Sequence, residues 1–245
     1  MEKDIKLNAK EFATFLKCMS AVQKAFCSDV NIKGGFLRQK SNDGLIIIEM
    51  DLTSLISDCD IILENIKNKL ALFNPLAKQD VNIKINEKKI TFSGVRSLVR
   101  FDMPSPDSSA NKFMPCEELN NLISLKEEDL VLEYAVKKDV SGLIKAVCKQ
   151  FAVNSVRISF GQSGASISAI TKNKEQYSEI DSGIPFNNVP QGYSNLYALP
   201  FIVDHDGDIS LKIYNIQDNV RINKFKTSIG TMDFTIYGRS PIVEE

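Results

Sequence analysis

The chain has 245 residues, of which 43% are hydrophobic and 25% are charged, and its formal net charge is −1. These values are typical of a globular protein with a sizeable core, arranged as one large domain or as two of roughly 120 residues each. The apolar runs are far too short to span a membrane, and the polar N-terminal segment does not have the pattern of a signal peptide.

The cysteine and histidine content argues against metal and disulfide chemistry. The five cysteines are odd in number, widely spaced and without a CxxC pair, so we expect free thiols in a reducing compartment such as the cytoplasm. His205 is the only histidine, which argues against histidine-based metal sites and most catalytic triads. We expect neither a metal nor a cofactor.

Residues 8–24 predict an amphipathic helix. Asn8 and Glu11 have the spacing of a capping box. The apolar positions recur with helical periodicity: Phe12, Phe15, Leu16, Met19 and Val22. Three lysines seven residues apart form a stripe on the opposite side: Lys10, Lys17 and Lys24. A seven-residue step drifts by only about 20°, so the stripe stays aligned along the helix.

The rest of the first half predicts a short helix and three strands. Residues 65–73 have helical spacing, and Lys67 and Lys69 flank the apolar stripe of this short helix. Residues 81–92 alternate between apolar and polar around a turn at 86–88, which predicts a β-hairpin, and another strand follows at 97–103.

Residues 104–122 begin with a stretch rich in Pro, Ser and Asn, which is typical of a connector. Phe113 and Met114 are unusual in a pure linker. We therefore place a first domain at 1–105, a connector at 106–129 and a second domain at 130–245.

The second half repeats the order of the first. Residues 139–153 predict a helix with Asp139 as its N-cap and an apolar face of Val140, Leu143, Ile144, Val147 and Phe151. Lysines stand on the other side: Lys138, Lys145 and Lys149. A short helix near Pro200, a hairpin at 209–222 and a strand at 231–238 follow. Matching elements lie about 128 residues apart, which indicates a duplicated domain.

Motifs of nucleotide-binding and hydrolytic enzymes are missing. The sequence contains no P-loop, no G-x-G-x-x-G and no G-x-S-x-G. The small residues at 161–166 fit the turn of a strand pair. Asp204, Asp206 and Asp208 lack the distal glutamate of a calcium loop, so we expect a polar turn there. We do not expect an enzyme.

The chain resembles the DNA polymerase sliding clamps, most closely those of T4-like phages and more distantly proliferating cell nuclear antigen. The resemblance covers nearly the whole chain. It rests on the order and spacing of these segments: LNAKEFATFLKCM, DIILENIKNKLALF, VNIKINEKKITF, DVSGLIKAVCKQF, NLYALPFIVDHDGDISLKIY and IYGRSPIVEE.

The resemblance implies an α+β fold of two clamp domains that assembles into a closed homotrimeric ring, with antiparallel sheets outside and helices lining the hole. Subunits would join through edge strands. The implied function is DNA replication processivity: the ring encircles duplex DNA and tethers the replicative DNA polymerase, with a clamp loader as a further partner.

The resemblance also implies the site residues. The DNA-facing set comprises Lys10, Lys17, Lys24, Lys67, Lys69, Lys138, Lys145 and Lys149, which would attract phosphates without reading bases. The expected partner-peptide groove comprises Leu45, Phe113, Met114, Val220, Tyr237, Pro241 and Ile242. The alternative is a viral structural or interaction protein of duplicated domains with no DNA role. Such a protein would have no need for lysine stripes that recur in both halves.

Overall fold

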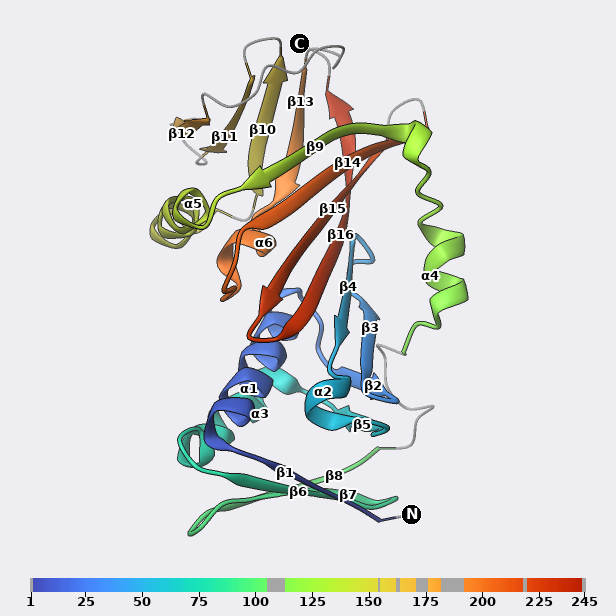
Figure 1. Cartoon of the computed structure of the whole chain (residues 1–245), viewed down its shortest axis with the longest axis vertical. Coiled ribbons are helices and arrows are strands. Elements are labelled where there is room, and N and C mark those ends of the chain that lie inside the picture. Colours follow the sequence, from blue (N-terminus) through green and yellow to red (C-terminus); the bar gives the residue numbers. More distant parts are fainter. Residues whose placement is uncertain are drawn as a thin grey trace. The chain divides into compact units, whose positions relative to one another are not determined.

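A computed structural model describes residues 2–104, 113–153, 155–161, 164–170, 176–181, 192–217 and 220–243 (Figure 1). The chain divides into two compact units, one of Met1–Pro115 with Ser228–Phe234 and one of Cys116–Thr227 with Thr235–Glu245. Each unit combines antiparallel sheets with a few helices, so the predicted α+β class is confirmed.

The first unit contains two four-stranded ladders. One has the order β1 (Lys3–Leu7), β6 (Val81–Ile85), β7 (Lys89–Ser93) and β8 (Leu98–Asp102). The other has the order β4 (Ile46–Asp51), β3 (Phe36–Lys40), β2 (Val30–Lys33) and β5 (Ile61–Leu63). Its helices are α1 (Ala9–Lys24), α2 (Thr53–Ile56), α3 (Ile66–Leu70) and the 3-10 helix η1 (Ala71–Leu76).

The second unit contains the corresponding ladders. One has the order β9 (Leu130–Val136), β14 (Ile209–Gln217), β15 (Val220–Ile229) and β16 (Met232–Val243). The other has the order β12 (Gln176–Asp181), β11 (Gly164–Ile170), β10 (Ser155–Gly161) and β13 (Gly192–Tyr197). Its main helices are α5 (Lys138–Gln150) and α6 (Leu199–Ile202), preceded by α4 (Cys116–Leu122) and the 3-10 helix η2 (Glu127–Asp129).

The duplication predicted from the sequence is visible in the strand pairing. In the first unit β1 pairs with β6, and in the second unit β9 pairs with β14, both antiparallel. The last residue of the first strand faces the first residue of its partner in each case, Leu7 with Val81 and Val136 with Ile209. Apart from α2, which lies between β4 and β5, both halves follow one β-α-β-β-β-β-α-β-β-β order. The domain boundaries at 105 and 129 stay a prediction, and α4 and η2 lie inside the expected connector.

The core of the first unit forms where α1 meets its sheet. The predicted capping box is present: the side chain of Asn8 accepts from Glu11 N, and the side chain of Glu11 accepts from Asn8 N. The buried face of α1 packs into a cluster of five aromatic rings contributed by α1, η1, β7 and β8: Phe12, Phe15, Phe73, Phe92 and Phe101. This burial orients the opposite side of α1 toward solvent.

Helix α5 differs from the prediction in its cap and in its buried face. Asp139 is not the N-cap, because the helix begins at Lys138 and its N-cap is Lys137, which provides no side-chain acceptor. Leu143 is 56% exposed and Phe151 is 36% exposed, so neither belongs to the buried face. The fully buried positions are Ser141, Ile144 and Cys148. A serine is tolerated there because its hydroxyl has hydrogen-bond partners.

Candidate nucleic-acid interface

Helix α1 presents its lysines to solvent from a firmly anchored position. Lys10 and Lys17 are exposed and Lys24 is half-buried. The N-terminus of α1 is held by Asn8 and also by Asp80, whose Oδ1 accepts a 2.9 Å hydrogen bond from Ala9 N. Within the described part of the chain, Lys10 and Lys17 have no carboxylate partner. Their ammonium groups are therefore available to an external anion.

Helix α3 provides one exposed and one half-buried lysine. Lys67 is exposed, whereas the ammonium of Lys69 lies 4.9 Å from the centre of the Phe101 ring. Burial lowers the pKa of Lys69, opposed by the nearby carboxylates of Glu64, Asp29 and Asp102. Lys69 is therefore partly engaged within its own unit, and Lys67 is the better placed of the two for an external phosphate.

Helix α5 presents a face with few free charges. Lys138 and Lys149 are exposed and Lys145 is half-buried. The other exposed positions of this helix include the uncharged Gly142 and Leu143. Among the described residues, Lys149 has no ion-pair partner.

The segment 203–208, which follows α6, binds to one side of α5. Lys145 pairs with the carboxylate of Asp204, and Lys138 Nζ donates to the main-chain oxygen of Asp206 at 3.0 Å. Asp208 accepts from Lys137 Nζ at 3.1 Å and from Lys138 N at 2.9 Å. The hydrogen bonds from Lys137 and from Lys138 N hold the pKa of the Asp208 carboxyl below its usual value.

The single histidine fastens the same segment to α5. Its Nδ1 lies 2.7 Å from the main-chain oxygen of Gly207, and its Nε2 lies 3.1 Å from Ser141 Oγ. Because a carbonyl only accepts, Nδ1 carries the proton of that bond. The 203–208 segment thus contacts α5 through ion pairs, a helix cap and a side-chain bridge. The segment that was predicted to be a polar turn therefore packs against α5.

Asp208 has an equivalent in the first unit. Asp80 stands directly before β6 and caps α1, and Asp208 stands directly before β14 and caps α5. Reasoning from the sequence missed both caps and chose Asp139 for the second helix. The signal was an aspartate at matching positions of the two halves, 128 residues apart. A cap provided from the far end of a domain leaves no mark near the helix itself.

The expected groove residues are divided between the two units. Leu45 is 45% exposed, Phe113 is half-buried, and Met114 is buried, with its main-chain N donating to Arg38 O at 2.9 Å. In the second unit Val220 and Tyr237 are half-buried, and the Lys224 ammonium lies 5.6 Å from the Tyr237 ring centre. The side chains of Pro241 and Ile242 lie outside the described ones. Their assembly into one groove stays a prediction.

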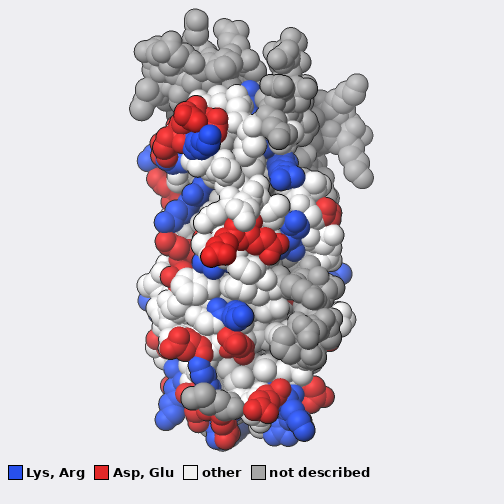
Figure 2. All heavy atoms as spheres, turned by 90° about the vertical axis from the view of Figure 1, so that its right-hand side faces the viewer, with Lys and Arg blue, Asp and Glu red and all other residues white. Residues whose placement is uncertain are grey.

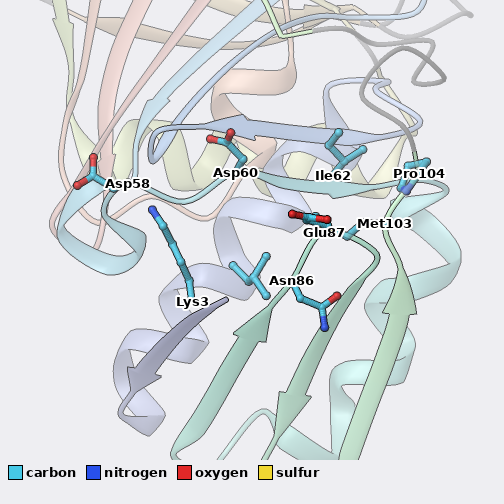
Figure 3. A pocket seen from close by; sticks show the side chains of 9 residues that line it. Lys3, Asp58, Asp60, Ile62, Asn86, Glu87, Met103 and Pro104 are labelled. Atoms are coloured by element: carbon cyan, nitrogen blue, oxygen red, sulfur yellow. The ribbon is translucent and has the colours of Figure 1, made fainter. Parts of the chain in front are cut away.

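A pocket of about 450 Å³ opens in the first unit, between the start of β1, the turn that connects β6 and β7, and the approach to β5 (Figure 3). Its lining combines acidic and apolar side chains around one lysine: Lys3, Asp58, Asp60, Ile62, Ile85, Asn86, Glu87, Met103 and Pro104. None of the residues predicted from the sequence lines this pocket.

Figure 2 shows one face of the molecule, on which acidic and basic side chains are intermingled. Within the described residues no cluster of histidine, cysteine and carboxylate side chains could hold a metal ion. No helix in that part of the chain is both long enough and apolar enough to cross a membrane.

Solved structures with the same fold are sliding clamps. The chain matches A. fulgidus PCNA, in a structure with the C-terminal region of FEN-1 bound, with a TM-score of 0.65, 12% identity and 100% of both chains covered. It matches the H. pylori beta clamp in complex with 5-chloroisatin with a TM-score of 0.64 and 10% identity, over 98% of this chain and 66% of that one. The PCNA2–PCNA3 complex from Sulfolobus tokodaii gives 0.61 and 10%, over 98% and 99%.

Comparison at the level of sequence finds no relatives. No protein-family model matches the chain, and no curated protein matches it. At 10 to 12% identity the structural likeness shows the fold alone. The chain therefore has the sliding-clamp fold, which the sequence resemblance predicted.

Proposed function

We propose that this chain is a sliding clamp, a homotrimer that closes into a ring around duplex DNA and tethers a replicative DNA polymerase. The observation that carries the proposal is the likeness of fold to sliding clamps over the full length of the chain. The proposal includes a clamp loader as partner and the cytoplasm as location, the host's if the chain is viral. We also propose that its relatives are the sliding clamps of T4-like phages. A tether of this kind needs no catalytic site.

The charge on the helices fits this function. A ring that slides must attract phosphates without binding bases, and exposed lysines provide an attraction that is independent of sequence. Lys10 and Lys17 project from a helix whose opposite face is locked into the aromatic core, so they are presented on a rigid support. Retention on DNA would come from the closed ring, so the phosphate contacts can stay weak.

Partner binding in this proposal uses a short peptide. The A. fulgidus clamp was solved with the C-terminal region of FEN-1, a terminal segment of its partner. We propose that terminal peptides of the polymerase and loader dock on this chain in the expected groove of Leu45, Phe113, Met114, Val220, Tyr237, Pro241 and Ile242.

Topological retention is the direct test of encirclement. A linear duplex is fixed to a bead at one end, incubated with the purified chain, and then blocked at its free end with streptavidin. A ring threaded on the duplex stays bound in high salt, because the blocked end prevents escape. Cutting the duplex near the block should release the protein. Equal loss of protein from blocked and unblocked duplexes in high salt would rule out encirclement.

A further inference from the structure

We propose that the two domains attract DNA unequally: the 203–208 segment neutralises helix α5, so the lysines of α1 and α3 hold the duplex. This inference rests on the proposed clamp function and names the residues that perform it. It also assigns a role to the acidic 203–208 segment, for which the sequence predicted only a polar turn.

The net charge of each helix pair, counted together with the segment that follows its second helix, differs in sign between the two domains. Helices α1 and α3 contribute five lysines and one glutamate. Helix α5, helix α6 and the 203–208 segment contribute three lysines and four aspartates. The stretch of the first domain that corresponds to this segment, 71–80, contains Lys78 and Asp80 and adds no net charge. Only the first domain therefore keeps a surplus of positive charge once the segment that follows its second helix is counted with the helices.

The aspartates of the segment engage the very lysines that α5 would offer to DNA. Asp204 pairs with Lys145, whose side chain is only 22% exposed. Lys138 donates to the main-chain oxygen of Asp206. A phosphate that approaches Lys145 must displace Asp204 or accept its repulsion. Of the lysines on α5, Lys149 is the one whose ammonium stays free among the described residues.

The segment is held in place by more than ion pairs, which individually are weak at a protein surface. Asp208 caps the first turn of α5 through Lys138 N, and the His205 ring bridges Ser141 and Gly207. A helix cap contributes about 1 kcal/mol, and Ser141 is fully buried. The carboxylates are therefore kept beside α5 even in salt that screens their attraction to the lysines.

Unequal attraction has a consequence for sliding. Three first domains would alternate with three nearly neutral second domains around the hole of a trimer. The duplex would then be held at separate positively charged patches. Fewer phosphates would be neutralised at any moment than if all eight expected lysines of each chain contacted DNA. Since the salt dependence of binding counts neutralised phosphates, the imbalance can be measured.

The test compares three variants of the full chain with the wild type by fluorescence anisotropy, using a labelled 30-base-pair duplex over a range of NaCl concentrations. Lys10→Ala/Lys17→Ala should weaken binding on the order of tenfold or more and lower the salt slope by about two for each chain of the ring that contacts the duplex. Lys145→Ala/Asp204→Ala removes a neutral pair and should leave the dissociation constant within about twofold. Asp204→Asn frees Lys145 and should tighten binding, with a steeper salt slope.

Matched controls separate local effects from net charge. Lys88→Ala/Lys89→Ala removes two exposed lysines at the β6–β7 turn and should not change binding. Glu118→Gln on α4 removes one exposed carboxylate, as Asp204→Asn does, and should have no effect. The inference is overturned if Lys145→Ala/Asp204→Ala weakens binding as much as Lys10→Ala/Lys17→Ala, or if Asp204→Asn binds like wild type. A wild-type chain that neither binds nor threads onto duplex overturns the proposed function itself.

Lysine acetylation tests the masking without DNA. With limiting reagent and mass spectrometry, Lys10 and Lys17 should react faster than Lys145, and Asp204→Asn should raise the rate at Lys145 severalfold. The rate at Lys149 should not change, because this residue has no ion-pair partner among those described. An unchanged rate at Lys145 in the Asp204→Asn chain would contradict the masking, whatever the duplex experiment shows.

Discussion

Four of the five cysteines are buried, and burial changes the pKa of their thiols. All five thiols are free, and Cys116 is the exposed one. Burial raises the pKa of Cys18 and of Cys27 to about 12, from an ordinary value of 9.0, and that of Cys148 to about 11. The folded protein therefore keeps these groups protonated at a pH where the unfolded chain ionises them.

This difference predicts a loss of stability in alkaline solution. Below pH 9 both states hold the thiol protons, and these groups add no pH dependence. Between pH 9 and the raised pKa the unfolded state loses protons first, so each thiol lowers the free energy of unfolding by about 1.4 kcal/mol per pH unit. Urea unfolding at pH 8, 9 and 10 should show a smaller decline in Cys148→Ala than in wild type. Parallel declines would contradict this assignment.

Single residues also show where sequence reasoning succeeded and where it failed. The capping box of Asn8 and Glu11 was predictable, because both partners lie within one turn of the chain. The caps by Asp80 and Asp208 join residues about 70 positions apart, and only the folded domain brings them together. The lysines of α1 were recognisable from periodicity, whereas the pairing of Lys145 with Asp204 depends on how α6 places the next segment.

At the scale of elements, a glycine in α5 allows a clean test of helix stability. Gly142 lies in the interior of the helix, and a Cβ added there would meet no atom within 4 Å. Gly142→Ala should therefore stabilise the protein by about 1 kcal/mol through helix propensity alone. The measurement is the midpoint of thermal or urea unfolding. A destabilised variant would show that this face of α5 is packed in the native protein.

Gly230, at the turn between β15 and β16, provides the comparison for Gly142, because the same substitution is expected to have the opposite effect there. Its φ is +63°, and an added Cβ would lie 2.9 Å from the Thr14 methyl group. Gly230→Ala should destabilise the protein by at least about 1 kcal/mol, because an L-residue is strained in this conformation. The two substitutions add the same methyl group and are expected to act in opposite directions.

Elements with a strong period were predictable and those shaped by packing were not. The hairpin of β6 and β7 and the pairing of β10 with β11 across 161–164 agree with the expectation from alternation and small residues. The helix expected at 65–73 exists as α3 and η1, with Pro75 inside the 3-10 turn. The exposure of Leu143 and Phe151 was not predictable, since periodicity cannot tell which apolar residues of a helix become buried.

The whole molecule offers sheet edges through which copies could join. In the first unit the ladder β1-β6-β7-β8 ends at β8, and in the second unit the ladder β12-β11-β10-β13 ends at β12. Leu98 is 58% exposed on β8, and Val95 just before it is 86% exposed. An exposed edge with apolar side chains is prone to pair with another chain. In the proposed ring, β8 is therefore the edge that we expect to bind the next subunit.

Backbone register identifies a residue whose replacement tests this edge. Ser97 O accepts from Gly94 N, and Met103 N donates to Lys88 O, both toward β7. Because hydrogen-bonding direction alternates along a strand, the N–H groups of residues 98 and 100 point away from β7. Arg100→Pro removes one outward donor and leaves the ladder with β7 intact. Arg100→Ala removes the same side chain and keeps the donor.

Light scattering gives the outcome of this test. The wild type and Arg100→Ala should have three times the 27.4 kDa mass of one chain, whereas Arg100→Pro should shift toward the single-chain mass at micromolar concentration. Circular dichroism and urea unfolding check that the proline variant remains folded. A folded Arg100→Pro trimer would place the subunit contact elsewhere than on the β8 backbone. A monomeric Arg100→Ala would assign the contact to the guanidinium group, since that variant keeps every main-chain donor.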